Sequence, residues 1–406
     1  MRDGWRETTL GAFLTPVRRI AAVSPDAEYK FVTLPVKGAG ARLRKVVRGA
    51  DVGSAKYIVR SGDLMISKID ARKGSNSLLP EDLDGAIVTG DFLSYEVDHS
   101  QVRRDYLDVL VRRAQFSELC DTVSSGTTNR VRLDPKRFLE LTIVVPPLNE
   151  QRRIVDLIAA VDGAVDAAEA EAGATLSLLQ AALDVHLDQA ESMRSIADIA
   201  LQPRGLVGGP FGSSLVSADY RDTGVPIIRG TNMPGFLGTY VGGDFAFVDP
   251  SKADALSGNL ALPGDVVFTQ RGTIGQVGMV PDDEHSRYVV SQSQMRLRVD
   301  PALSTPEYVR FVFTAPAMVS ALRAQDRATA NPHINLGVLA KTEVPVPPLH
   351  VQDALVSDWG ALQSAAEAAR ATANALRALR SNLLTVLLSG EHEIPSSYDV
   401  LLEEVA

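Results

Sequence analysis

The sequence predicts an α/β (α+β) fold in which two similar globular domains are each followed by a long helix, and the two helices form an antiparallel coiled coil. Three observations predict this. The segment VPPLNEQ at 145–151 returns as VPPLHVQ at 346–352, 201 positions later. After both copies, apolar or small residues recur in alternating steps of four and three. Upstream of both copies, strand-like runs match one another at an offset of 202.

The repeat divides the 406 residues into five consecutive parts. We expect a first globular domain at 1–145, a first helix at 146–192, a second globular domain at 193–345, a second helix at 346–390 and a tail at 391–406. Two copies are too few for a solenoid, so we expect a pseudo-twofold internal repeat.

Both globular domains read as short strands separated by Gly/Pro turns, with some helix. Gly62-Asp63 matches Gly264-Asp265, and each pair begins a strand-like run. VTGDFLSYEV at 88–97 aligns with VSQSQMRLRV at 290–299, and TTNR at 127–130 lies over TANP at 329–332. The two domains are therefore predicted to share one fold.

The helices are predicted from their starts, their seams and their ends. Two prolines without a backbone donor precede Asn149, which can cap a helix that runs to about His186. The seam runs from Ile154 to Ala182 and again from Leu355 to Leu383, with Arg380 as its single polar break. Sustained 3.5-residue spacing predicts a coiled coil rather than two unrelated surface helices, and alanines in the seam allow close approach. Ser389-Gly390 is a suitable C-terminal cap.

Composition narrows the class of protein. There is one cysteine, and the six histidines are scattered, so no disulfide or zinc site is predicted. The first residues have no apolar signal core and no segment is apolar enough to span a bilayer, so we expect a cytoplasmic protein without membrane contact. The net charge of −9 is uneven: residues 1–145 hold 23 basic and 19 acidic side chains, and residues 146–192 hold 2 and 9.

Motifs for catalysis are not found. GGPFGSS at 208–214 lacks the Gly-Lys-Ser/Thr ending of a phosphate-binding loop, and RGTIGQVG at 271–278 lacks the GxGxxG spacing. NPHI at 331–334 is not the Asn/Asp-Pro-Pro-aromatic loop of an adenine methyltransferase, and PDAEYK at 25–30 is too compact for a nuclease metal site. We therefore predict no catalytic residue, metal ligand or bound cofactor.

Basic residues are clustered in the first domain, as a surface that faces phosphates requires, although a charge run is also compatible with a solvated face. Base readout needs side chains such as Arg, Asn or Gln on loops. The candidate DNA-binding residues are Arg42, Arg44, Lys45, Lys68, Arg72, Lys73, Asn129, Arg130, Arg132, Arg229, Asn232, Arg271, Thr273, Gln292 and Asn331.

These strings resemble the specificity subunits of type I restriction-modification systems, the HsdS family. The resemblance is carried in the second half by GGPFGSSL (208–215), VPIIRGTNM (225–233), PGDVVFTQRGTIGQVGMVP (263–281) and VPVPPLHVQ (344–352). In the first half it is carried by SGDLMISKIDARKGS (61–75), GTTNRVRL (126–133) and VPPLNEQRRIV (145–155). Two departures exist: GTT reads RATA at 327–330, and LNEQR reads LHVQD at 349–353.

The resemblance implies a non-catalytic subunit whose two target-recognition domains each read one half of a bipartite site in double-stranded DNA. The helices would fix the spacing of the half-sites and dock two modification (methyltransferase) subunits. S-adenosylmethionine would be bound by those partners, and a restriction subunit can add ATP-dependent translocation and cleavage. The acidic total charge leaves a second hypothesis open, a coiled-coil scaffold that binds proteins and has no DNA specificity.

Overall fold

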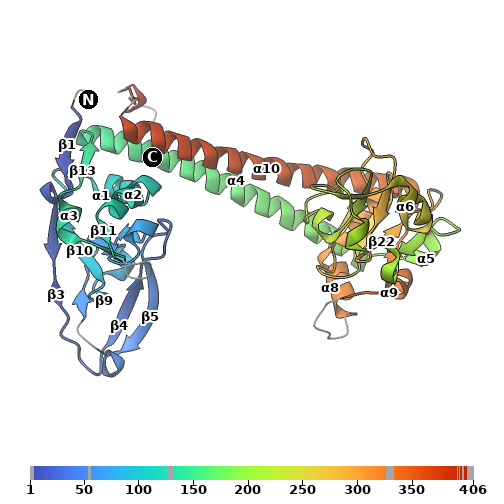
Figure 1. The fold of residues 1–406 in the computed structure, drawn as a ribbon, viewed down its shortest axis with the longest axis horizontal. Helices are drawn as coiled ribbons and strands as arrows, with labels where there is room; N and C mark the ends of the chain where they lie inside the picture. Colours follow the sequence, from blue (N-terminus) through green and yellow to red (C-terminus); the bar gives the residue numbers. More distant parts are fainter. Residues whose placement is uncertain are drawn as a thin grey trace. The chain divides into compact units, whose positions relative to one another are not determined.

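The computed structural model describes residues 4–53, 56–126, 131–325, 333–390, 392, 394–395 and 397–399. Contacts divide the chain into two compact units, Met1–Val165 with Asn374–Ala406 (unit 1) and Asp166–Ala373 (unit 2). Each long helix contributes one part to unit 1 and the other part to unit 2 (Figure 1). The five-part division expected from the sequence stays a prediction.

A four-stranded antiparallel sheet forms the centre of each unit. In unit 1 its order is β2-β10-β7-β8, from β2 (Leu14–Val17), β7 (Leu64–Ser67), β8 (Asn76–Leu78) and β10 (Phe92–Val97). In unit 2 the order is β15-β22-β19-β20, from β15 (Leu206–Gly208), β19 (Val266–Thr269), β20 (Val277–Met279) and β22 (Gln294–Leu297). The strands that begin at Leu64 and Phe92 return at Val266 and Gln294, 202 residues later. The predicted repeat of the fold is confirmed.

A second sheet in each unit follows the same plan. Unit 1 has the order β3-β6-β9-β4-β5, from β3 (Arg19–Ile20), β4 (Glu28–Thr33), β5 (Arg42–Arg48), β6 (Tyr57–Ile58) and β9 (Ile87–Val88). Unit 2 has β18-β21-β16-β17, from β16 (Val225–Ile228), β17 (Ala246–Val248), β18 (Leu260–Ala261) and β21 (Tyr288–Val290). β4 pairs in parallel with β9, as β16 does with β21.

Helices and small ladders complete each unit. In unit 1, β1 (Arg6–Thr9) pairs with β13 (Thr142–Val145) and β11 (Ser124–Ser125) with β12 (Arg132–Leu133); in unit 2, β14 (Met193–Ser195) pairs with β23 (Glu343–Pro345). The unit 1 helices are α1 (Arg104–Val111), α2 (Ala114–Thr122) and α3 (Pro135–Leu139). Those of unit 2 are α5 (Ile196–Ile199), α6 (Pro250–Ala255), α7 (Pro306–Thr314), α8 (Pro316–Ala324) and α9 (Leu336–Lys341).

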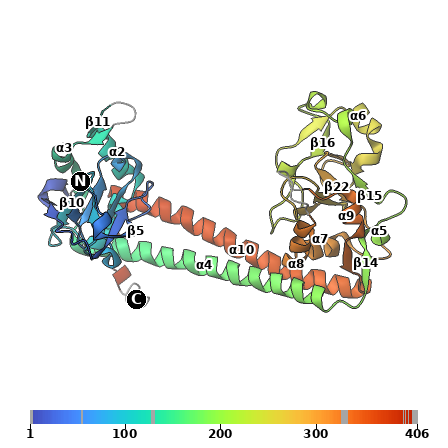
Figure 2. The ribbon, with the colours of Figure 1, turned by 90° about the horizontal axis from the view of Figure 1, so that it is seen from below.

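The two long helices are α4 (Leu148–Asp188) and α10 (Leu349–Ser389), each of 41 residues. They run side by side in each unit (Figure 2). Their predicted seam is buried from Ile154 to Ala172, and from Trp359 to Ala373 it is buried except at Leu362, which is partly buried. α10 ends at Ser389, and Gly390 has φ +76°, so the predicted cap is confirmed. The prediction for Asn149 is wrong in detail: α4 begins at Leu148, and the Asn149 side chain accepts a hydrogen bond from Glu150 N (3.0 Å) within the first turn. No described helix combines the length and apolarity that crossing a membrane needs.

The polar break in the seam is an ion pair between the helices. In unit 1, Arg380 of α10 donates through Nε to Asp162 Oδ1 and through Nη2 to Asp162 Oδ2 (3.0 Å). Both side chains are partly exposed, so this ion pair lies at the solvent-exposed edge of the seam. In unit 2, the imidazole of His186 packs edge-on against Trp359, with ring centroids 5.2 Å apart.

The glutamine that ends both repeated segments fixes each long helix to its own unit. Gln151 is fully buried; its Oε1 accepts from Arg103 N (2.7 Å), and its Nε2 donates to Pro146 O (2.9 Å) and Gln101 O (3.3 Å). Gln352 is equally buried and bonds in the same way to the chain segment before α7. The repeated VPPL…Q segment therefore builds one joint between helix and domain twice.

Candidate nucleic-acid interface

In unit 2, three loops gather at one end of the four-stranded sheet. The turn after β19 carries Arg271 and Thr273, both exposed, and the turn before β22 carries Gln292. Gln270 N donates to Ser293 O (2.7 Å), and Gly209 N, after β15, donates to Gln294 O (3.0 Å). Residues that are far apart in the sequence thus meet in one loop cluster, which contains three of the predicted DNA-binding residues.

The equivalent loops gather in unit 1. Lys68, which follows β7, donates its backbone N–H to Asp91 O (2.8 Å) and accepts from Leu133 N (2.8 Å). The second of these bonds returns in unit 2 as Ile334 N to Gln270 O (3.0 Å). Lys68 and Arg132 lie in this cluster, and Arg72 and Lys73 lie on a 3-10 turn (Ala71–Lys73) in the connection that leaves it.

The cations of this cluster are held by weak surface contacts. Lys68 Nζ donates to Gly90 O (3.0 Å), Arg132 Nη1 pairs with Asp91 (2.8 Å), and Lys73 Nζ pairs with Asp70 (3.0 Å). The side chains of Arg132 and Lys73 are 54% and 55% exposed. Exposed pairs of this kind contribute about 0–1 kcal/mol, so exchanging the carboxylate for a phosphate costs little. Arg72 Nε is buried without a hydrogen-bond partner.

Arg42, Arg44 and Lys45 form a second group, on strand β5 at the edge of the five-stranded sheet. All three are exposed. The register with β4 skips Arg44, because Phe31 pairs with Lys45 and Val32 with Leu43. Such a bulge changes the direction of side chains on an edge strand, and here it adds a cation to the exposed edge.

Other predicted residues are engaged inside the protein. The Asn232 side chain is 2% exposed; its Nδ2 donates to Gly242 O and Asp244 O (3.1 Å each), and its Oδ1 accepts from Arg229 N (3.0 Å). Arg229 Nη2 donates to Asp244 O (3.1 Å), and Gln292 Nε2 donates to Gly212 O (2.6 Å). These side chains hold loops of the protein in place, so the predicted contacts of Asn232, Arg229 and Gln292 with bases gain no support from this placement. Asn129, Arg130 and Asn331 lie outside the described residues.

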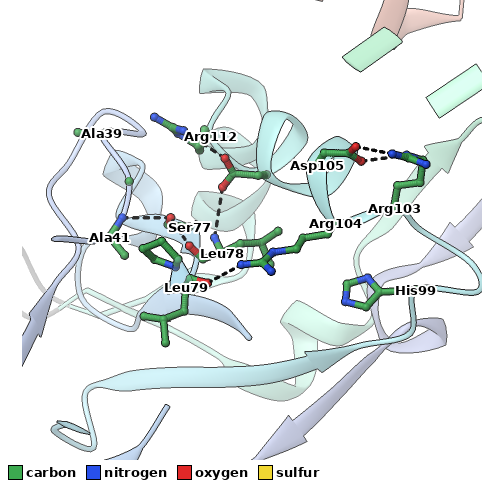
Figure 3. Close-up of a pocket in the computed structure, with 13 residues that line it drawn as sticks. Ala39, Ala41, Ser77, Leu78, Leu79, His99, Arg103, Arg104, Asp105 and Arg112 are labelled. Atoms are coloured by element: carbon green, nitrogen blue, oxygen red, sulfur yellow. Dashed lines mark hydrogen bonds and ion pairs between the residues drawn. The ribbon is translucent and has the colours of Figure 1, made fainter. Parts of the chain in front are cut away.

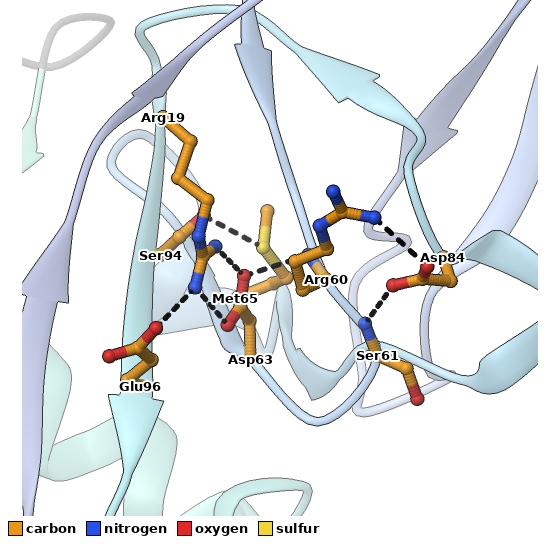
Figure 4. A network of polar contacts seen from close by, with 8 residues as sticks. All are labelled: Arg19, Arg60, Ser61, Asp63, Met65, Asp84, Ser94 and Glu96. Atoms are coloured by element: carbon orange, nitrogen blue, oxygen red, sulfur yellow. Dashed lines mark hydrogen bonds and ion pairs between the residues drawn. The ribbon is translucent and has the colours of Figure 1, made fainter.

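The repeated Gly-Asp pair precedes β7 and β19, so it lies at the opposite end of each strand from Lys68 and Gln270 of the loop clusters. Asp63 is buried, accepts from Arg60 N (2.8 Å) and pairs with Arg19 Nη1 (2.5 Å), as Figure 4 shows. The hydrogen bond to Asp63 raises the pKa of Arg19. Asp265 accepts from Leu262 N (2.8 Å) and pairs with Arg298 through two bonds of 2.7 and 2.8 Å. The aspartate is thus kept in both units, whereas its cation comes from a different strand.

A cavity of about 720 Å³ in unit 1 is also lined by charged side chains (Figure 3). Its arginines are engaged: Arg104 donates to Leu79 O (3.0 Å), Arg112 pairs with Asp108 (3.1 Å), and Arg103 pairs with Asp105 (2.6 Å). Over the part of the chain that the structure describes, no cluster of three or more His, Cys, Asp or Glu side chains is placed to hold a metal ion.

Sequence reasoning missed two apolar residues beside the loop clusters. Phe211 lies in GGPFGSS, which reads as a turn, and Ile20 lies in an ordinary strand-like run. Their side chains are 89% and 76% exposed. Large apolar residues are usually buried, so nothing in either segment indicates that the side chain of Phe211 or Ile20 is exposed.

Comparisons with known proteins agree with this architecture. Residues 243–357 match the family model described as the type I restriction modification DNA specificity domain. The type I restriction enzyme HindI specificity subunit of Haemophilus influenzae is 26% identical over 117 residues, which are 28% of this chain and 25% of that protein. The chain thus spans about a quarter of the length of this curated relative.

Solved structures match over nearly the whole chain. A chain from a study of complex assembly and conformational transition of the type I R-M system has a TM-score of 0.66 at 20% identity, covering 96% of this chain and 98% of that one. The HsdS subunit from Thermoanaerobacter tengcongensis has a TM-score of 0.54 at 20% identity, covering 97% and 98%. The type I S subunit from M. genitalium has a TM-score of 0.51 at 11% identity, covering 95% and 96%. At these identities the likeness establishes the fold.

Proposed function

We propose that this chain, whose residues 243–357 match the family model of the type I restriction modification DNA specificity domain, is the DNA sequence-specificity subunit of a type I restriction-modification complex. In this proposal each unit reads one half of a bipartite site in double-stranded DNA. The observation that carries the proposal is the pair of equivalent loop clusters, each at the same end of an equivalent sheet and each containing predicted DNA-binding residues.

The chemistry is assigned to partner subunits. Two modification subunits that bind S-adenosylmethionine would dock on α4 and α10 and methylate adenine N6, and a restriction subunit can join them. The specificity subunit itself would be non-catalytic and cytoplasmic. The acidic charge of residues 146–192, 2 basic against 9 acidic side chains, favours protein partners over DNA along α4, because carboxylates repel phosphates.

The long helices would act as a spacer in this function. Each is continuous over 41 residues, about 61 Å at 1.5 Å per residue. A DNA turn measures about 34–36 Å, so helices of this length are suited to setting the number of unread base pairs between half-sites. The buried joints at Gln151 and Gln352 support this role, since each ties a helix start to one reading unit.

The test is to purify the chain together with its modification subunits and to map the methylated sites. The proposal predicts one bipartite, asymmetric motif with a fixed gap. Charge reversal at Arg42, Arg44 and Lys45 should then lower DNA affinity and flatten its salt dependence, because each lost phosphate contact removes about 0.9 from the slope. A complex that forms but methylates no defined motif would support the scaffold hypothesis instead.

A further inference from the structure

Two apolar side chains stand out on the surface of the described chain. Phe211 is 89% exposed and Ile20 is 76% exposed, the highest values among the large apolar side chains that the structure describes. Single exposed apolar residues are common and need no explanation by themselves. The position of these two in the internal repeat is what makes them informative.

Both residues follow the same strand of the repeated sheet. In unit 1, Pro16 of β2 pairs with Tyr95, and in unit 2, Leu206 of β15 pairs with Leu297, which is the counterpart of Tyr95 at an offset of 202. Ile20 comes four residues after Pro16, and Phe211 comes five residues after Leu206. The two units therefore place a bare apolar side chain at closely matching points, although the local sequences differ.

The backbone that presents Phe211 is fixed. Gln292 Nε2 donates to Gly212 O (2.6 Å) and Leu215 O (3.3 Å), and Asn259 Nδ2 donates to Gly208 O (2.7 Å). A Cβ on Gly209 would lie 1.9 Å from Ser291 O, so only glycine allows this close approach. Four anchors thus hold a loop whose central aromatic ring touches little of the protein.

The backbone that presents Ile20 is fixed as well. Arg19 is turned toward the sheet, where it pairs with Asp63 (2.5 Å) and Glu96 (2.7 Å), as Figure 4 shows. Because successive side chains of an extended chain point to opposite faces, Arg18 and Ile20, the two neighbours of Arg19, project from the face opposite to the Arg19 side chain. Arg18 lies over the Tyr57 ring, 4.4 Å from its centroid, and donates to Tyr57 Oη (2.6 Å).

Both side chains lie beside the loop clusters rather than on a remote face. The loop of Phe211 is bonded to Gln292, next to Ser293, which accepts from the backbone of Arg271. Arg18 and Tyr57 lie beside Gly90, since a Cβ there would be 3.8 Å from Arg18 Nη2 and 3.7 Å from Tyr57 Cε2, and Gly90 O accepts from Lys68. The Phe211 loop is thus connected to the turn that carries Arg271, and the residues next to Ile20 are connected through Gly90 to Lys68.

We propose that Phe211 and Ile20 make apolar contacts with bases of the bound DNA, one in each half-site, an inference that rests on the proposed function. Phe and Ile are among the side chains that proteins insert between base steps, and Phe also packs against thymine methyl groups. The anchored loops remove the ordering cost that a mobile side chain would carry. The surrounding cations hold the phosphates, and the apolar side chain adds discrimination between sequences.

The experiment measures binding of the assembled complex to a duplex that carries its mapped site, at several salt concentrations. Phe211→Ala should weaken site-specific binding about fivefold or more and leave the salt slope and non-specific binding unchanged, because no charge is lost. Arg271→Ala should instead reduce the slope by about 0.9. Phe236→Ala is the matched control: Phe236 is partly exposed in unit 2, on a segment that is tied to α10 by Gln363.

Methylation mapping then assigns each residue to one half-site. Ile20→Ala should relax the motif only in the half-site read by unit 1, and Phe211→Ala only in the half-site read by unit 2. Unchanged thermal unfolding of both variants would show that the units still fold. The inference is overturned if the Phe211→Ala complex binds its site with an affinity within twofold of the complex without the substitution. It is also overturned if the variant loses its modification subunits while the remaining intact complexes bind DNA normally. If the complex without any substitution does not prefer its mapped site over other DNA, the proposed function itself is overturned.

Discussion

Replacing Gln352 with alanine tests the joint that the repeated segment builds. The side chain is fully buried and makes four hydrogen bonds: Oε1 accepts from Ser304 Oγ (2.8 Å) and Thr305 N (3.2 Å), and Nε2 donates to Leu303 O (3.0 Å) and Pro347 O (2.8 Å). At about 1 kcal/mol for each net hydrogen bond, the substitution should lower the free energy of unfolding of unit 2 by about 4 kcal/mol. Gln151 makes three such bonds, so Gln151→Ala should cost unit 1 about 3 kcal/mol.

The assay is hydrogen exchange followed by mass spectrometry, because it reports the stability of α1 and α7 separately and does not require two-state unfolding of a two-unit chain. Gln352→Ala should speed exchange in α7 and leave α1 unchanged, and Gln151→Ala should do the reverse. Gln189→Ala, at an exposed glutamine after α4, is the matched control. A loss below about 1 kcal/mol in α7 would refute the assignment of Gln352 as a joint.

Three further predictions follow from the same contacts. Burial lowers the pKa of His186, so the unfolded chain binds the proton more tightly than the folded chain. The free energy of unfolding of unit 2 should therefore be constant above pH 6.5 and fall at lower pH. In denaturant titrations, His186→Leu, which copies Leu387 at the equivalent position of α10, should remove this pH dependence. Asp265→Asn breaks a buried ion pair and should destabilise unit 2 by about 3–5 kcal/mol, whereas Asp249→Asn, in an exposed pair with Arg221, should change it by less than about 1. Deleting one heptad at paired positions of α4 and α10 removes about 10 Å and should shorten the unread gap by about 3 base pairs, as methylation mapping would show; an unchanged gap argues against the spacer role.

The repeat in the sequence predicted the architecture because it is found both in the heptad spacing of the seam residues and in the spacing of the strands. The burial of Ile154 and Trp359 and the matched strands that begin at Leu64 and Val266 follow from patterns within the one sequence. Arg380 was predicted as a defect of the seam, but its partner Asp162 is 218 residues away, and no local pattern connects the two.

The site was harder to predict because the fate of a polar side chain depends on its neighbours in space. Arg271 and Asn232 both look suited to DNA, yet Arg271 is exposed while the Asn232 amide is used by backbone groups 10 and 12 residues away. Gln151 and Gln352 occupy the same position of the repeated segment in the sequence. Their burial under the segments before α1 and α7 could be seen only in the structure. Phe211 was missed for the opposite reason, since a turn-like glycine context gave no hint that its ring is held in solvent.

The measurement that tests the central claim most directly is the motif methylated by the complex after residues 1–145 are exchanged for the corresponding segment of another specificity subunit. If each unit reads one half-site, the half-site read by unit 1 should change to that of the donor, and the other half-site and its methylated adenine should stay the same. A motif that remains unchanged in both halves would contradict the account.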